Sequence, residues 1–170
     1  MSCWRARNLL SPCEGACDVP LLDTPDIRQL GPYDCGRAAA LIVLRYYGMS
    51  EADAATSAGR IPVDKHDGTD PAQLAAWARH EGWHVNEGWM DLHTVRHHGA
   101  QGTPVILLAT LHGGGHWVVS RGIARRSIYL QDPATGRDKH DIDEFTKVWH
   151  DANRYGARFR QWGIVMVPQL

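Results

Sequence analysis

The sequence predicts an α+β fold in which helices come first along the chain and an antiparallel sheet follows. Three observations support this prediction. Helix signals dominate residues 35–98, and strand-like apolar segments dominate from residue 104 onward. The chain has 170 residues, 44% of them apolar, which suffices for one buried core without disulfides or a structural metal. Helices segregated from strands along a chain are typical of α+β domains.

The first expected element is a helix over residues 35–47. Good helix formers and apolar residues fill it, and Gly48 is a suitable stop. Asp34 precedes it and suits an N-cap. Its first residue is Cys35, and a thiol at a helix N-terminus feels the positive end of the helix dipole, which favours the thiolate. Because the thiolate is the reactive form, this position suits a nucleophile.

Two more helices are expected before the first strand. Ser50 opens one of them, with Asp53 three residues on in a partial capping box. Asp70 and Pro71 open the other as N-cap and first helical residue, and Gly82 is expected to end it. Its buried stripe is formed by Leu74, Trp77 and Ala78.

The rest of the chain is expected to be mostly extended. An extended segment starts at Trp83, and residues 91–98 favour a helical turn or two. Residues 141–149 indicate an amphipathic helix before the last strand. The strand-like segments are 104–111, 116–123, 127–132 and 160–167.

A histidine and an aspartate lie on neighbouring expected strands. His116 follows three glycines near the start of one strand, and Asp132 ends the next. Two strands joined by a turn would place these side chains together. A carboxylate there fixes the imidazole tautomer and leaves the other ring nitrogen for a thiol. Gln29 and the backbone N–H of Cys35 could then donate to an oxyanion.

Five short motifs carry a family resemblance. They are Gln29, Asp34-Cys35-Gly36, Tyr46-Tyr47-Gly48, His116-Trp117-Val118-Val119 and Asp132-Pro133-Ala134-Thr135-Gly136. In this order, and from about residue 20 to the C-terminus, they resemble the C39 cysteine peptidases, a branch of the papain-like superfamily. The resemblance implies a papain-like fold and a thiol peptidase. It assigns Cys35 as nucleophile, His116 as general base, Asp132 as its orienter and Gln29 as oxyanion donor.

The resemblance also implies a substrate. Many members of the family cut bacteriocin or related precursor peptides after a Gly-Gly leader and form the N-terminal part of an ABC exporter. A peptide or protein precursor is therefore the expected substrate, and the residues expected to contact it are Asp34, Gly36, Gly115 and Trp117. Acyl or amide transfer on the same triad, and peptide binding without catalysis, stay open as alternatives.

The longest strongly apolar run covers residues 104–111, far short of the roughly 20 residues that a membrane helix needs. The sequence therefore predicts a stand-alone member with no membrane segment, served by a separate transporter or presenting partner. No signal peptide is visible, because residues 8–12 lack the apolar run of one, and a cytoplasmic location is expected. A reducing compartment suits Cys35, since oxidation would abolish a thiolate nucleophile.

Composition gives no electrostatic reason to expect nucleic acid as a partner, since the formal net charge is −1. Residues 1–24 are expected to form a loosely ordered extension, and residues 25–170 the peptidase domain. Three more cysteines lie in the extension, namely Cys3, Cys13 and Cys17. A zinc site would need a fourth ligand at a zinc-finger spacing, and the extension offers none. No metal or other cofactor is expected.

One rival motif points to a different chemistry. The segment His80-Glu81-Gly82-Trp83-His84 satisfies the H-E-x-x-H pattern of zinc metallopeptidases. That pattern works only on a continuous helix, where both histidines share a face. Gly82 is expected to end the helix before His84, so the match is interpreted as coincidental. Two further histidine pairs share the four-residue spacing, namely His93/His97 and His112/His116. Such pairs become metal ligands only on a helix, and the second pair spans three glycines. His93 and His97 are interpreted as polar surface residues.

Overall fold

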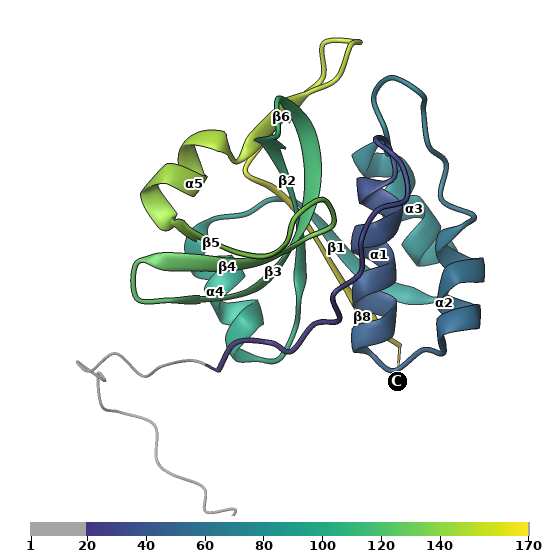
Figure 1. Cartoon of the computed structure of the whole chain (residues 1–170), viewed down its shortest axis with the longest axis horizontal. Coiled ribbons are helices and arrows are strands. Elements are labelled where there is room, and N and C mark those ends of the chain that lie inside the picture. The colour runs from purple at the N-terminus through teal and green to yellow at the C-terminus, as the bar shows by residue number, and fades with distance from the viewer. Residues whose placement is uncertain (1–19, 170) are drawn as a thin grey trace, which may run out of the picture.

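The computed structural model describes residues 20–169. The helices that come early in the chain lie together on one side of a large antiparallel sheet (Figure 1). The first three helices are α1 (Cys35–Tyr46), α2 (Glu51–Ala58) and α3 (Pro71–His80). Strands then dominate, interrupted by α4 (Leu92–Ala100) and α5 (Ile142–Val148). The predicted α+β class is therefore confirmed.

The helix starts follow the local sequence signals. The Ser50 hydroxyl accepts a hydrogen bond from the Asp53 N–H at 3.1 Å, which caps α2. Asp70 caps α3 by accepting from the N–H of Ala72 at 2.9 Å, with Pro71 in the first helical position. These contacts confirm the helix starts expected from the sequence. The segment expected as a turn or two after residue 91 is the nine-residue helix α4.

Six antiparallel strands form the main sheet in the order β1-β8-β2-β3-β4-β5. Their bounds are β1 (Trp83–Trp89), β2 (Val105–Leu111), β3 (Gly114–Ala124), β4 (Ser127–Asp132), β5 (Gly136–Asp141) and β8 (Trp162–Pro168). A separate hairpin joins β6 (His150–Ala152) and β7 (Arg158–Arg160). Local sequence patterns do not predict β5, β6 or β7, because these strands are short and carry charged residues that strands ordinarily disfavour.

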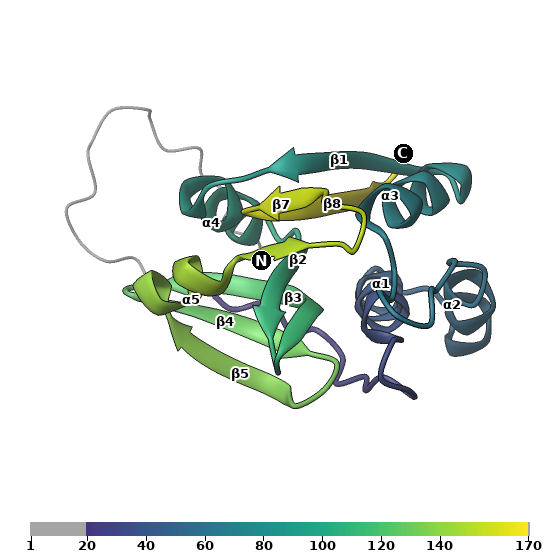
Figure 2. The ribbon, with the colours of Figure 1, turned by 90° about the horizontal axis from the view of Figure 1, so that it is seen from above.

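The sheet is buried on both faces, and β2 shows why its sequence is continuously apolar. Ile106 and Leu108 belong to the core beneath α1 and α3, whereas Leu107 and Ala109 belong to the core beneath α4 and α5. Side chains of a strand alternate between faces, so a strand covered on both sides must be apolar throughout. Figure 2 shows the two groups of helices on opposite sides of the sheet.

The segment before α1 runs along the sheet beside β3. Leu22 and Arg121 exchange two hydrogen bonds, one from the Leu22 N–H at 2.8 Å and one from the Arg121 Nε at 3.0 Å. Thr24 is buried. The rest of the expected extension, with Cys3, Cys13 and Cys17, lies outside the described residues, so its loose order and the domain boundary stay predictions. Across residues 20–169, none of the helices combines the length and apolar character that spanning a bilayer requires.

Candidate active site

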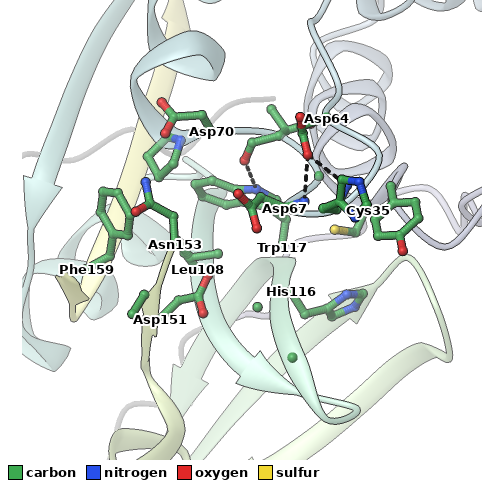
Figure 3. Close-up of a pocket in the computed structure, with 18 of the residues that line it drawn as sticks. Cys35, Asp64, Asp67, Asp70, Leu108, His116, Trp117, Asp151, Asn153 and Phe159 are labelled. Atoms are coloured by element: carbon green, nitrogen blue, oxygen red, sulfur yellow. Dashed lines mark hydrogen bonds between the residues drawn. The ribbon is translucent and has the colours of Figure 1, made fainter. Parts of the chain in front are cut away.

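Cys35 is the first residue of α1, and its thiol lies at a cleft of about 640 Å³. The same cleft is lined by Gln29 and His116. Figure 3 shows the sulfur of Cys35 directed toward His116, across the boundary between α1 and the sheet. Because the first N–H groups of a helix lack intrahelical acceptors, the start of α1 offers both donors and a favourable dipole to a negative charge.

His116 and Asp132 meet as the two-strand argument predicts. β3 and β4 pair antiparallel, and the His116 Nε2 lies 2.6 Å from the Asp132 Oδ1. Both residues are buried. Since Nε2 is engaged with the carboxylate, Nδ1 is the ring nitrogen left for the thiol of Cys35. This is the arrangement that a general base needs beside a nucleophile.

Electrostatics favour the charged forms of this pair. Burial opposes a charge on His116, but hydrogen bonds to Asp132 and to Cys35 outweigh it and raise the pKa of His116 to about 9. Burial also raises the pKa of Asp132. Hydrogen bonds from His116, His112 and the Ala134 N–H more than offset this, so the pKa of Asp132 lies well below its usual range. At neutral pH the pair is therefore an imidazolium and a carboxylate.

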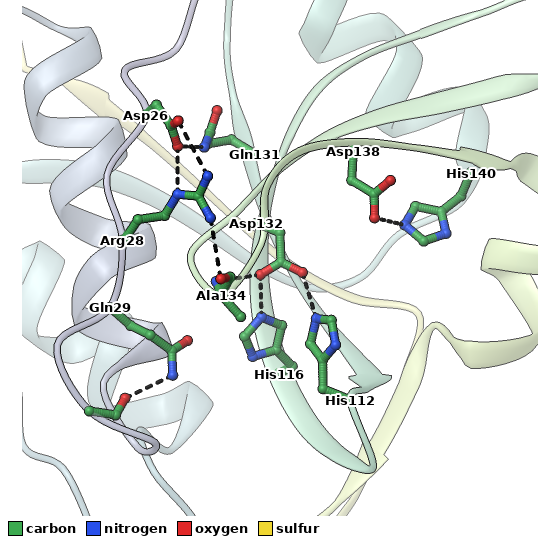
Figure 4. Close-up of polar contacts among 11 residues, drawn as sticks. Asp26, Arg28, Gln29, His112, His116, Gln131, Asp132, Ala134, Asp138 and His140 are labelled. Carbon is green, nitrogen blue, oxygen red and sulfur yellow. Dashed lines mark hydrogen bonds and ion pairs between the residues drawn. The ribbon is translucent and has the colours of Figure 1, made fainter.

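A second histidine touches the same carboxylate, and the sequence analysis did not assign it. The His112 Nε2 lies 2.8 Å from the Asp132 Oδ2, so Asp132 stands between two imidazoles (Figure 4). One ring nitrogen of His112, one ring nitrogen of His116 and one carboxylate oxygen of Asp132 lie within 4.8 Å of one another. This spacing could also hold a metal ion. The signal for His112 in the sequence is its four-residue spacing from His116, which is typical of metal ligands only on a helix.

Gln29 sits in a loop that is tied to the chain beyond Asp132. Its backbone N–H donates to the Pro133 carbonyl at 2.9 Å, and its side-chain Nε2 donates to the Gly31 carbonyl at 2.8 Å. The primary amide has two N–H donors, so one remains for a ligand in the cleft. Nearby, the Gln131 Nε2 donates to Asp26 at 2.8 Å and joins the same two segments again (Figure 4).

Two of the expected substrate-contacting residues line the cleft. Trp117 is almost fully buried, and its indole N–H donates to the Thr69 carbonyl at 3.0 Å. Gly115 also lines the cleft, and a Cβ there would come within 2.1 Å of the Asp151 carboxylate. The glycine is therefore required by the close approach of Asp151.

The other two expected contacts lie elsewhere. Gly36 packs beneath Thr69, where an added Cβ would stand 2.5 Å from the Thr69 Cβ. Close packing of α1 thus explains this glycine. Asp34 lies 3.8 Å from Arg37 and lines a separate small groove between α1 and α2. The structure places neither residue among those that line the cleft of Cys35.

An arginine bridges two segments that line the cleft. Arg154, in the turn between β6 and β7, lies 3.0 Å from Asp64 and 3.1 Å from Asp67, both in the segment between α2 and α3. These ion pairs join two walls of the cleft. Nothing local in the sequence pairs Arg154 with Asp64, which lies 90 positions away along the chain.

The fold separates the two histidines of the zinc-peptidase motif, His80 and His84, onto different elements. α3 ends at His80, whereas His84 lies on β1. A hydrogen bond from Arg60 holds the pKa of Glu81 at about 2, and Ser57 donates to the same carboxylate at 2.6 Å. Because the two histidines share no helix face and the glutamate is already engaged, these residues cannot form the metallopeptidase site.

Comparisons with known proteins agree with this architecture. The family model described as Peptidase C39 family matches residues 23–153. A double glycine motif protease from an AMS/PCAT transporter, solved in complex with the leader peptide, is 21% identical with a TM-score of 0.65, covering 88% of this chain and 94% of that one. The peptidase domain of Streptococcus ComA, a bi-functional ABC transporter involved in a quorum sensing pathway, is 18% identical with a TM-score of 0.66. The match covers 84% of this chain and 97% of that one.

A C39-like peptidase from Bacillus anthracis is 16% identical with a TM-score of 0.66, covering 89% of this chain and 98% of that one. No curated protein shows significant similarity to the chain. At these identities the likeness to solved structures shows the fold. The fold implied by the sequence resemblance is therefore confirmed.

Proposed function

The chain belongs to the Peptidase C39 family, and we propose that it is a cysteine peptidase whose nucleophile is Cys35. One observation carries the proposal. His116 is held by Asp132 at 2.6 Å through Nε2, while its other ring nitrogen is left for a thiol at the start of α1. A nucleophile, a base and an orienting carboxylate in this order make up a catalytic triad.

In the proposed reaction, the Cys35 thiolate attacks the carbonyl carbon of the scissile peptide bond. The carbonyl oxygen becomes an oxyanion, and the donors proposed for it are the Cys35 backbone N–H and the Gln29 side-chain amide. Protonated His116 then gives its Nδ1 proton to the leaving amine, and the C–N bond breaks to leave a thioester. His116 next takes a proton from water, which attacks the thioester and releases the carboxylic acid and the thiolate.

We propose a precursor peptide with Gly-Gly before the scissile bond as the substrate. The support is twofold. The similar structure from the AMS/PCAT transporter is a double glycine motif protease, and family members of this kind act on such leaders. In this chain, Trp117 and Thr69 wall the cleft beside Cys35 and hold each other by a hydrogen bond at 3.0 Å, an arrangement suited to residues without side chains.

The proposal extends to partner and compartment. A transporter is the proposed partner, because two of the similar structures are peptidase domains of transporters. The cytoplasm is the proposed location. Cys35 is the free thiol within residues 20–169, and oxidation would remove it as a nucleophile.

A matched pair of peptides tests the proposed function. One peptide carries Gly-Gly before the scissile bond, and the other carries Gly-Leu in the same context. We expect the wild-type protein to cut the first peptide at the bond after the second glycine and to leave the second largely intact. Binding of the peptide without cleavage, unchanged in Cys35→Ala, would overturn the peptidase proposal. Equal cleavage of both peptides would overturn the Gly-Gly specificity alone.

A further inference from the structure

The connection between β2 and β3 is a two-residue hairpin turn that contains His112. Leu111 pairs with Gly114 across the hairpin, so His112 and Gly113 form the loop. Both have positive φ, 55° and 86°. Positive φ at both central residues defines the type I′ turn, in which Asn-Gly is the preferred pair. The turn thus explains Gly113 but gives no reason for a histidine before it.

The ring of His112 folds back from this turn onto the Asp132 carboxylate. Its Nε2 lies 2.8 Å from Oδ2, and its ring meets that of His116 edge-on with centroids 4.9 Å apart (Figure 4). The side chain of His112 is 45% exposed, while that of Asp132 is 3% exposed. His112 therefore covers the carboxylate on the side that faces the cleft, which it also lines.

Hydrogen bonding of the carboxylate is complete only with His112. Oδ1 accepts from the His116 Nε2 and, at 2.7 Å, from the Ala134 N–H. Oδ2 accepts its hydrogen bond from the His112 Nε2. Without it, a buried charged oxygen would lose its donor, which is costly enough to make the carboxylate turn toward another partner. Any such rotation would pull Oδ1 away from His116.

We propose that His112 is a positioning residue, which fixes the plane of the Asp132 carboxylate so that Oδ1 holds His116 in register with Cys35. The inference rests on the proposed function, because it concerns the geometry of the same triad. His112 itself touches neither the substrate bond nor the thiol. Its contribution is transmitted through Asp132.

Two substitutions separate the hydrogen bond from the turn. His112→Asn keeps a residue preferred in a type I′ turn, but its amide is too short to reach Asp132. His112→Gln places an N–H donor at nearly the reach of the imidazole Nε2 and carries no ring. His93→Asn, on the exposed face of α4, is the matched control for the loss of a histidine.

The experiment follows the rate at which iodoacetamide alkylates Cys35, measured by mass spectrometry of the Cys35 peptide between pH 6 and pH 8. The alkylation rate of an ordinary thiol falls by about a hundredfold when the pH is lowered from 8 to 6. In the wild type and in His93→Asn we expect a fall of less than about threefold, because an assembled pair keeps the thiolate. Alkylation of His112→Asn should be slower than that of the wild type at pH 6 by about tenfold, which is the effect of a rise of about one unit in the pKa of the thiol. His112→Gln should recover most of that loss.

Different outcomes overturn different claims. Equal rates at pH 6 in the wild type and His112→Asn would overturn the positioning role while leaving the triad intact. A loss in His112→Gln as large as that in His112→Asn would also overturn it, since the donor would then not be what matters. A wild type that labels like an ordinary thiol, unchanged in His116→Ala, would overturn the proposed triad and the inference with it. Circular dichroism of each variant identifies any loss that comes from unfolding.

Discussion

The backbone N–H of Gln29 donates a hydrogen bond to the Pro133 carbonyl at 2.9 Å, joining the segment before α1 to the turn after Asp132. Arg28 reinforces the same junction by donating to the Ala134 carbonyl at 3.3 Å. The proposed oxyanion donor and the orienting carboxylate are therefore set by one junction between distant parts of the chain. Because Gln29 contributes to this junction through its backbone N–H, side-chain substitution at Gln29 should leave the junction in place.

Gln29→Ala is expected to lower kcat by about 10² to 10³, the usual cost of removing one oxyanion donor. KM should change little, because the lost interaction belongs to the transition state. Steady-state cleavage of the Gly-Gly peptide measures both constants, and Gln101→Ala, at the end of α4, serves as the control. A loss of only a few-fold in kcat would remove Gln29 from the site.

Substitutions within the proposed triad should be strongly non-additive. Cys35→Ala and His116→Ala are each expected to abolish nearly all cleavage, and the double variant should be no worse than either one. Asp132→Ala should retain roughly 10- to 100-fold more activity than these, because its role is to orient and stabilise His116. Single-turnover rates with the Gly-Gly peptide measure the differences. Additive losses would show that Cys35 and His116 do not act as a unit.

Much of this site could be anticipated because its signals are local. The cap at Asp70, the end of the helix near Gly48 and the apolar run of β2 each involve a few neighbouring residues, and all appear in the structure. The meeting of His116 and Asp132 required only one hairpin. This is the range over which sequence patterns determine geometry.

What sequence analysis missed depends on long-range contacts. His112 gains its partner only because a tight turn aims it at a neighbouring strand. Arg154 pairs with two aspartates far away in the chain, and Gly36 is fixed by Thr69 on another segment. None of these partners is encoded by spacing along one element. Each is decided by how separate elements pack.

Stability should depend on pH through His116. Its pKa of about 9 in the folded protein exceeds the ordinary histidine pKa of 6.5, so protonation favours the folded state. This contribution is fully present below about pH 6.5 and is lost as pH rises through about 9. At most it amounts to about 3 kcal/mol at 1.36 kcal/mol per pKa unit. Urea unfolding from pH 6 to pH 9.5 should show the decline in the wild type, and a flatter profile in His116→Gln. Parallel profiles would contradict it.

Gly36→Ala should destabilise the fold by about 1–3 kcal/mol, the usual range for overpacking. The added methyl group would stand 2.5 Å from the Thr69 Cβ, which belongs to a segment held by the indole of Trp117. Thr69→Gly removes that obstacle, so the double variant should regain part of the loss. Urea unfolding of the four proteins forms a double-mutant cycle. A cycle without coupling would show that the cost arises elsewhere.

Arg154→Ala should weaken substrate binding without slowing the chemical step. Arg154 lines the cleft and ties the β6–β7 turn to Asp64 and Asp67, so its loss frees one wall of the cleft. Because exposed ion pairs are weak, the expected increase in KM is only about two- to fivefold, at constant kcat. Added salt should raise the wild-type KM toward that of the variant, because salt screens exposed pairs. Arg158→Ala removes the same charge from the same hairpin and is the matched control. An equal rise in KM for both variants would show that net charge, and not the bridge across the cleft, sets the affinity.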